Sequence, residues 1–256
     1  MSPRILYKAP IAAAVIGLFA LSALVGLALF RGRLRQRRFQ VRNVSFHARL
    51  FLRLTGVRVQ TELVPFERVG RGSLIVSNHV SYLDAMVLAA SYPAILVTSV
   101  EVRETPFLGH ISRLCGCVFV ERRSRATINE EVERISGILA DGFNVVLFPE
   151  GTSTDGSEVL PFKRSLFRTA VGAGAAVKPM TLNYRSIDGE PVSASNRDRV
   201  FYYGDLRFGP QFLDFLGNRS VMVQLKEAEM LADAPDHRVL AERAFESVRG
   251  GFIPVV

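Results

Sequence analysis

Residues 73–85 read SLIVSNHVSYLDA and contain the pattern that decides the fold. The run 73–77 is apolar, short and uncharged and predicts a buried strand, whereas 84–90 predicts a helix. A polar turn containing His79 joins the two. A buried strand that leads directly into a helix is typical of α/β proteins, so this segment predicts the fold class.

The same alternation of strands and helices continues along the chain, starting with a strand at Val57. Further strands are predicted at 94–99, 117–120, 144–148, 177–184 and 221–225, and helices at 128–139, 162–173 and 237–248. Residues 185–219 are expected to be irregular. No Pro/Ser-rich linker interrupts 57–256, so we expect one α/β domain with a mixed sheet flanked by helices.

His79 and Asp84 are the pair best placed for acid–base chemistry. Within one helix, five residues of separation would turn them about 140° apart around the axis. With His79 in the turn and Asp84 in the first helical turn, the carboxylate can instead reach the imidazole. Such a pair leaves one ring nitrogen free to take a proton. Taken alone, a helix-capping Asp beside an unrelated His is the simpler interpretation.

Two more predicted strands end in polar residues. The strand 144–148 is followed by Glu150 and Gly151, and the strand 117–120 runs into Arg122, whose guanidinium suits phosphate or carboxylate groups. Ligands of α/β proteins bind at the carboxyl ends of the strands. We therefore expect these residues and His79 to share one edge of the sheet.

An uncharged segment of 22 residues, 9–30, precedes this domain. At about 1.5 Å per residue, a helix of this length spans about 33 Å, enough to cross a hydrocarbon core of roughly 30 Å. A cleaved signal peptide is the alternative, but its apolar region is usually only about 7–15 residues long and is not normally followed by a run such as RGRLRQRR. We expect a transmembrane anchor with a basic flank at 1–33.

Basic residues are concentrated in 1–61, which hold 11 Lys and Arg and no Asp or Glu. The rest of the chain is slightly acidic, which argues against a nucleic-acid partner. Residues 34–56 predict a basic amphipathic helix on the bilayer surface, with a helix packed on the core as the alternative. Five arginines at 31–38 predict that 57–256 lies on the cytoplasmic side of a bacterial-type inner membrane.

Together the polar segments resemble the glycerolipid acyltransferases of the 1-acylglycerol-3-phosphate acyltransferase type. That family carries an NHx4D motif, a hydrophobic strand ending in Arg, an FPEGTRS motif and a strand containing proline. Their order and spacing agree with this chain across about 78–184, and 46–59 is similar to the usual lead-in. The matching segments are Asn78-His79 with Asp84, then 116–122, 148–152 and 177–180.

The resemblance implies transfer of a fatty acyl group from a thioester of acyl carrier protein or coenzyme A to a lysolipid hydroxyl, with no metal or other cofactor. The first expectation for the acceptor is 1-acylglycerol-3-phosphate, which would give phosphatidic acid. His79 would act as general base and Asp84 would hold its ring. The implied substrate-binding residues are Asn78, Arg122, Glu150, Gly151 and Thr152.

The chain departs from the family motif at Ser153, where an arginine assigned to the acceptor's phosphate is usual. The segments TSTDG at 152–156 and YYGDLRF at 202–208 are more similar to bacterial members that act on other lysolipids, including lyso-ornithine lipid. Lys163 and Arg164 are further candidates for an anion contact, and they fit a solvated helix start equally well. Lyso-ornithine lipid therefore stands as the alternative acceptor.

Two other classes of function use parts of this pattern. A hydrolase would use the same His–Asp pair to activate water and would release free fatty acid. A non-catalytic lipid-binding protein would keep the anchor but would not need His79, Asp84 and Glu150 together.

The sequence shows no zinc site and no nucleotide loop. Cys115 and Cys117 lack the second pair that a zinc site needs, and 172–178 lacks the GK[ST] ending of a phosphate-binding loop.

Overall fold

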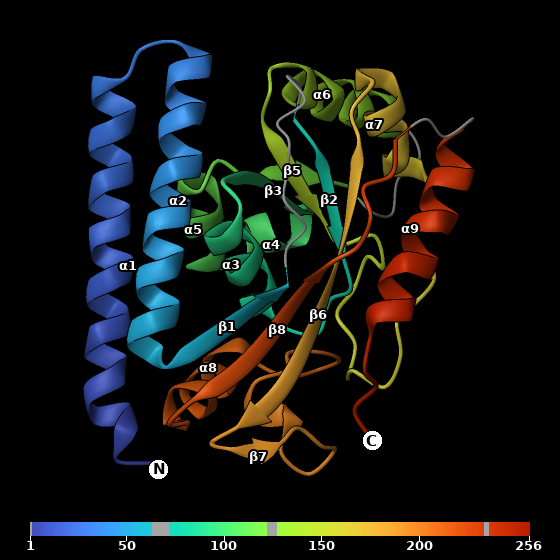
Figure 1. The fold of residues 1–256 in the computed structure, drawn as a ribbon. Coiled ribbons are helices and arrows are strands. Elements are labelled where there is room, and N and C mark those ends of the chain that lie inside the picture. Colours follow the sequence, from blue (N-terminus) through green and yellow to red (C-terminus); the bar gives the residue numbers. More distant parts are fainter. Residues whose placement is uncertain (1, 63–71, 122–126, 233–235) are drawn as a thin grey trace.

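The computed structural model describes residues 2–62, 72–121, 127–232 and 236–256, and its centre is a mixed β-sheet (Figure 1). The strands are β1 (Val57–Glu62), β2 (Leu74–Ser77), β3 (Ala94–Ser99), β4 (Val118–Val120), β5 (Asn144–Leu147), β6 (Val177–Ile187), β7 (Glu190–Pro191) and β8 (Val221–Glu227). Their order is β1-β8-β6-β2-β5-β3-β4, with β7 paired to β6. β6 runs antiparallel to β7 and β8, and the other neighbours are parallel.

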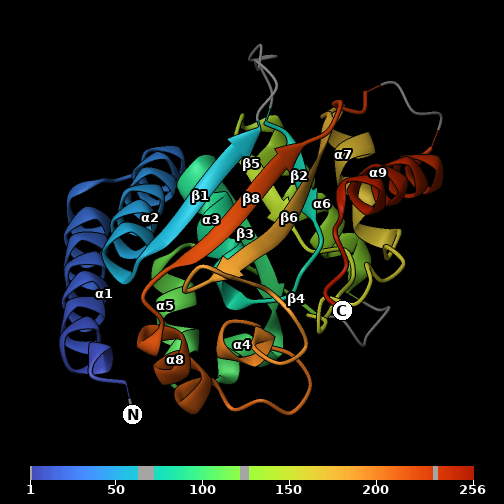
Figure 2. The same cartoon turned by 60° about the horizontal axis from the view of Figure 1, so that its bottom comes forward.

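Helices cover both faces of this sheet (Figures 1 and 2). They are α1 (Arg4–Leu29), α2 (Arg33–Thr55), α3 (Tyr82–Ser91), α4 (Val100–Glu104), α5 (Leu108–Leu114), α6 (Ile128–Ala140), α7 (Arg168–Ala173), α8 (Phe208–Gly217) and α9 (His237–Gly251). The helices α1, α2, α3 and α8 lie on one face, and α6, α7 and α9 lie on the other. The predicted α/β class with a mixed sheet and flanking helices is confirmed.

Element boundaries differ from the sequence prediction in three places. The predicted helix 162–173 is shorter, with a 3-10 turn at Ser165–Phe167 before α7, and the backbone N–H of Lys163 donates to Pro149 O at 2.9 Å. The region 185–219 contains α8, which was not predicted, and α4 and α5 were also missed. Pro210 is compatible with α8 because it lies in the first helical turn.

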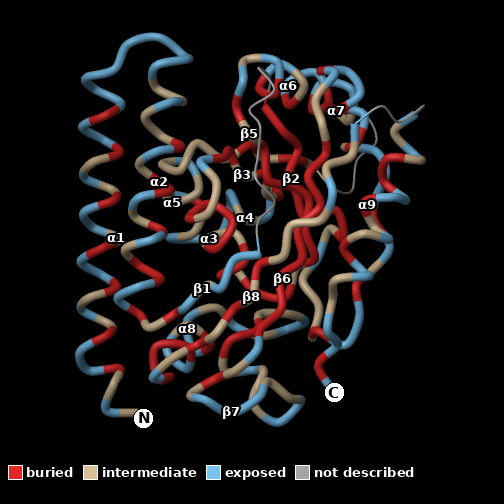
Figure 3. Tube along the Cα trace, in the orientation of Figure 1, coloured by how far each residue is buried: buried red, intermediate tan, exposed pale blue. Residues whose placement is uncertain are grey.

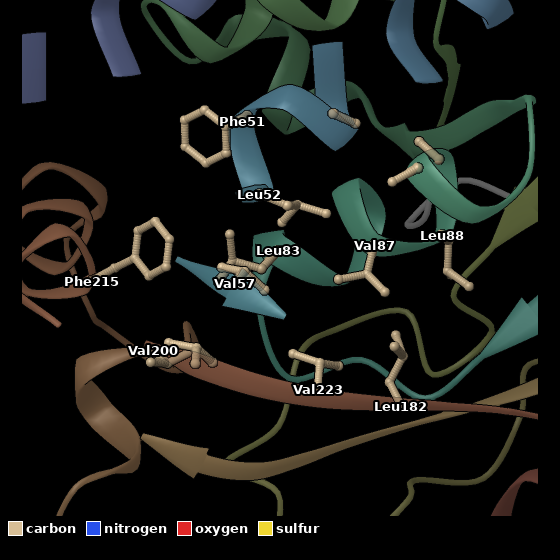
Figure 4. Close-up of a cluster of buried hydrophobic side chains, with 14 of the residues drawn as sticks. Phe51, Leu52, Val57, Leu83, Val87, Leu88, Leu182, Val200, Phe215 and Val223 are labelled. Carbon is tan, nitrogen blue, oxygen red and sulfur yellow. The ribbon is translucent and has the colours of Figure 1, made fainter. Parts of the chain in front are cut away.

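Apolar side chains fill the space on both sides of the sheet. On the face of α3, Leu83, Val87 and Leu88 are fully buried and lie against α2 and β8 (Figure 4). On the opposite face, α6, α7 and α9 bury a second cluster. Figure 3 shows that β2, β5 and β6 are buried along most of their length, as expected of strands covered on both sides.

α1 and α2 form an antiparallel hairpin against the face that carries α3 (Figure 1). α2 buries Val44, Ala48 and Leu52, so the predicted amphipathic helix packs its apolar face on the core, and its contact with a bilayer stays a prediction. α1 is long and apolar enough to cross a membrane. In this structure it lies along α2, and the predicted transmembrane anchor at 1–33 stays a prediction.

Lys8 ties the N-terminal end of α1 to the rest of the molecule. Its side chain is buried, and Nζ donates hydrogen bonds to the carbonyl oxygens of Thr55, Asn218 (2.6 Å) and Arg219 (3.3 Å). Thr55 ends α2 and Asn218 caps α8. Carbonyls at helix ends have no intrahelical partner, so one ammonium group satisfies two helix ends and fixes the hairpin.

The variant Lys8→Met should lower the free energy of unfolding by about 1–3 kcal/mol, because it leaves buried carbonyls without a donor. Thermal unfolding in detergent measures this change. Arg4→Met is the matched control, since the Arg4 side chain has no hydrogen bond or ion pair with a described residue. Equal stability of the two variants would show that the contact of Lys8 does not hold α1.

Candidate active site

The carboxyl end of β2 leads through a turn at 78–81 into α3. Ser81 is the N-cap: its backbone is extended and its Oγ accepts a hydrogen bond from the N–H of Leu83 at 3.3 Å. Asp84 completes a capping box by accepting from the N–H of Ser81 at 2.8 Å. These bonds satisfy N–H groups that a first helical turn leaves unpaired. The turn therefore holds His79 just ahead of the helix start.

His79 and Asp84 form a hydrogen-bonded pair, with 2.9 Å between Nδ1 and Oδ2. Asp84 is fully buried, and the same Oδ2 also accepts from the N–H of Val80 at 2.7 Å. A carboxylate can only accept, so Nδ1 carries the proton and Nε2 is left as the basic nitrogen. Asp84 caps α3 and also orients the imidazole. The two interpretations of the motif, a helix-capping Asp and a His–Asp pair, are therefore compatible.

Tyr184 on β6 completes the surroundings of Asp84 and was not predicted from the sequence. Its hydroxyl donates to Asp84 Oδ1 at 2.7 Å, and its ring is buried. Burial and the neighbouring carboxylate raise the pKa of Tyr184 well above its usual value, so the hydroxyl stays a donor. Nothing in the sequence around residue 184 distinguishes this tyrosine from an ordinary strand aromatic.

Glu150 holds the backbone of His79. It is buried, its Oε1 accepts from the N–H of His79 at 2.6 Å, and its Oε2 accepts from the N–H of Leu160 at 2.7 Å. Burial raises the pKa of Glu150 to about 7, while the two N–H groups act in the opposite direction by favouring the charged form. Both carboxylate oxygens thus have a backbone donor, one of them His79, and the substrate-binding role that the resemblance implied for Glu150 stays a prediction.

Asn78 holds the turn before α3, and Phe148 holds the imidazole ring of His79. Asn78 is buried and makes two hydrogen bonds to the backbone of Leu182 on β6, at 3.0 Å and 2.8 Å. Its side chain thus ties the turn to the sheet, and the contact with a substrate that the resemblance implied stays a prediction. The ring of Phe148 stacks on the imidazole of His79, with 4.1 Å between ring centres.

The loop after Phe148 brings the other predicted residues close to His79. The carbonyl of His79 accepts from the N–H of Thr154 at 2.9 Å. Gly151 has φ +76°, a left-handed backbone conformation that favours glycine. Thr152 is exposed on the same loop, and Arg122 lies outside the described residues.

A hollow of about 600 Å³ opens where β3, β4 and β5 end. It lies on the face of α6, α7 and α9, and Phe148 forms part of its wall. Three basic and two acidic side chains line it: Lys163, Arg164, Arg168, Glu121 and Glu131. Lys163 and Arg164, the further candidates for an anion contact, lie here, and the lining carries both signs of charge.

An apolar groove of about 240 Å³ lies on the opposite face of the sheet, between the α1–α2 hairpin and α3, α5 and α8. Phe19, Phe51, Tyr82, Met86 and Phe212 are among its lining residues. Such a groove suits a hydrocarbon chain. Among the described residues, no group of three or more His, Cys, Asp or Glu side chains is placed to hold a metal ion.

Comparisons with known proteins agree on one family. The acyltransferase family model matches residues 56–183. Lyso-ornithine lipid O-acyltransferase of Rhizobium meliloti is 36% identical over 77% of this chain and 68% of its own length, and that of Brucella abortus is 33% identical over 80% and 79%. The 1-acyl-sn-glycerol-3-phosphate acyltransferase of Neisseria gonorrhoeae is 38% identical over 44% of each chain.

A solved structure shows the same fold. The crystal structure of the 1-acyl-sn-glycerophosphate (LPA) acyltransferase PlsC from Thermotoga maritima matches with a TM-score of 0.66 and 22% identity. The match covers 97% of this chain and 92% of that one, so the N-terminal helices are part of the shared fold.

The variant Tyr184→Phe should lower the free energy of unfolding by about 1.5–3 kcal/mol, because a buried carboxylate oxygen loses a hydrogen bond. Tyr203→Phe provides the control: its hydroxyl also bonds to a carboxylate, that of Asp198, but on the exposed surface. Chemical denaturation of both variants measures the difference. If the two lose the same amount, the bond to Asp84 contributes nothing specific to the site.

Proposed function

The chain belongs to the acyltransferase family, and we propose that it transfers a fatty acyl group from a thioester of acyl carrier protein or coenzyme A to the hydroxyl of a lysolipid. The observation that carries this proposal is the pair His79–Asp84, in which Nδ1 is occupied and Nε2 is free to accept a proton. Phe148, which stacks on the ring of His79, lines the charged hollow, and Tyr82, two positions before Asp84, lines the apolar groove.

In this mechanism, the acceptor hydroxyl gives its proton to His79 Nε2 as its oxygen attacks the thioester carbonyl. Asp84 stabilises the imidazolium that forms. The serines near the pair are poor candidates for an acyl-enzyme, since Ser77 and Ser81 are fully buried and Ser81 Oγ already donates to Val200 O at 2.7 Å. Direct attack by the acceptor is therefore the simpler route.

The two cavities suit the two ends of the reacting molecules. We place the acyl chain in the apolar groove, because its walls offer almost only hydrocarbon and aromatic surface. We place the acceptor's headgroup in the charged hollow, where Lys163, Arg164 and Arg168 can meet an anion and Glu131 can meet a cation.

Lyso-ornithine lipid is the acceptor we favour, since an ornithine headgroup carries both a carboxylate and an ammonium group. The relatives matched over two thirds or more of their length act on this lipid by name, whereas the glycerolipid relative is matched over 44%. Ser153 also lacks the charge that would bind a terminal phosphate. 1-Acylglycerol-3-phosphate stays a second candidate, because the basic residues of the hollow suit a phosphate as well.

A lysolipid dissolves in the bilayer, so the enzyme must work at its surface. The outer side of α1 exposes Leu18, Leu21 and Leu24, and α2 presents arginines that attract anionic headgroups. We propose that the hairpin holds the protein on the cytoplasmic face of the inner membrane.

Transfer should fall by about 10³-fold in His79→Ala, because proton removal from the acceptor loses its base. Asp84→Asn should lose about 10²-fold or more by misorienting the ring. Purified protein is incubated with labelled acyl-acyl carrier protein or acyl-coenzyme A and a panel of lysolipids, and the lipids are then separated. Turnover within threefold of wild type in His79→Ala would exclude this base, and labelled free fatty acid without acylated lipid would identify a hydrolase.

The variant Ser153→Arg should raise the ratio of kcat/KM for 1-acylglycerol-3-phosphate over lyso-ornithine lipid by about tenfold, since a charge-assisted contact to phosphate contributes on this scale. Ser157→Arg adds the same charge further along the exposed part of this loop and should leave the ratio unchanged. An unchanged ratio in both variants would show that position 153 takes no part in acceptor choice.

A further inference from the structure

Tyr82 has a buried hydroxyl with no hydrogen-bond partner among the described residues. It is the first residue of α3, two positions before Asp84 and three after His79. Two other tyrosine hydroxyls of the chain are bonded to carboxylates: that of the buried Tyr184 to Asp84 and that of the partly buried Tyr92 to Glu227, both at 2.7 Å. A buried donor without an acceptor is destabilising, so the hydroxyl of Tyr82 requires an explanation.

The ring of Tyr82 is held firmly by aromatic neighbours. Ring centres lie 5.3 Å away for Phe208, 6.0 Å for Tyr202, 6.2 Å for Phe212 and 6.4 Å for Phe215. A phenylalanine would make the same ring contacts without burying a polar atom. The hydroxyl is therefore not needed for packing.

Tyr82 lines the apolar groove, together with Phe208 and Phe212. Burial raises the pKa of Tyr82 far above its usual value, which keeps the hydroxyl protonated and able to donate. A fatty acyl chain in this groove has one polar atom near its reactive end, the carbonyl oxygen, and that oxygen can only accept. The hydroxyl of Tyr82 is a donor without an acceptor, and the carbonyl oxygen of the acyl group is an acceptor without a donor in the groove. The two groups are therefore complementary.

We propose that the hydroxyl of Tyr82 donates a hydrogen bond to the carbonyl oxygen of the acyl thioester and stabilises the oxyanion that forms during transfer. This inference rests on the proposed acyl transfer and adds a residue to it. It makes Tyr82, the first residue of α3 and part of the groove wall, a catalytic residue of the transfer.

The reaction then balances as follows. The acceptor oxygen bonds to the carbonyl carbon while its proton moves to His79 Nε2, and the carbonyl electrons move to the oxygen that Tyr82 holds. The tetrahedral intermediate collapses, the C–S bond breaks, and the proton on His79 passes to the departing sulfur. The products are an ester and a thiol, and Tyr82 keeps its own proton throughout.

The variant Tyr82→Phe tests this role, because it removes only the hydroxyl. We expect kcat to fall by about 100-fold, as on loss of one oxyanion donor, with the KM for the thioester within about twofold of wild type. We expect the melting temperature of the substrate-free protein to stay equal or to rise, since an unpaired buried group is removed. Tyr184→Phe should do the opposite to stability and lower the melting temperature.

Tyr202→Phe is the control for activity, since Tyr202 is a neighbouring phenol that does not line the groove. It should keep kcat within about twofold of wild type. A kcat of Tyr82→Phe within threefold of wild type, or a loss confined to KM, would overturn the proposal. A lower melting temperature in Tyr82→Phe with unchanged kcat would also overturn it, by showing that the hydroxyl is structural.

These outcomes are separate from those that test the proposed function. If the wild type transfers acyl groups and Tyr82→Phe does so equally well, only the role of Tyr82 fails. If the wild type transfers no acyl group from either thioester to any lysolipid, the proposed function fails instead, and the role of Tyr82 fails with it.

Discussion

The buried carboxylate of Asp84 accepts hydrogen bonds from four donors, and the arrangement of the site depends on it. Three donors come from the turn before α3: His79 Nδ1 and the N–H groups of Val80 and Ser81. The fourth is the hydroxyl of Tyr184 on β6. A buried charge is stable only when such donors surround it, so the carboxylate fixes the turn, the helix start and the imidazole in one step. The same carboxylate that caps the start of α3 thus also orients the imidazole of His79.

The loop after β5 supports the same turn from the other side. Glu150 and Thr154 bond to the N–H and the carbonyl of His79, and Phe148 stacks on its ring. The imidazole of His79 therefore lies between two supports, and the apolar groove and the charged hollow lie on opposite faces of the sheet. This separation matches a reaction that joins a hydrocarbon donor to a polar acceptor.

Much of this arrangement could be predicted from local sequence, because strand, turn and helix follow each other within 73–90. The spacing of His79 and Asp84 allowed the pair and the family resemblance favoured it, whereas the α/β class followed from the alternation of elements. Tyr184 and the positioning role of Glu150 could not be predicted, since each depends on a contact between segments 70 or more residues apart. The packing of α1 against the domain also depends on distant contacts, because Lys8 bonds to the carbonyl oxygens of Thr55 and Asn218, and hydropathy carries no information about such contacts.

The tautomer of His79 is the most direct test of the dyad. The chain has four histidines, so ¹⁵N-histidine labelling gives a simple spectrum in which the signals of His79 are those lost in His79→Ala. Neutral His79 should carry its proton on Nδ1 and show an unprotonated Nε2, because Asp84 accepts at Nδ1. A neutral ring protonated on Nε2 would contradict base catalysis by this nitrogen.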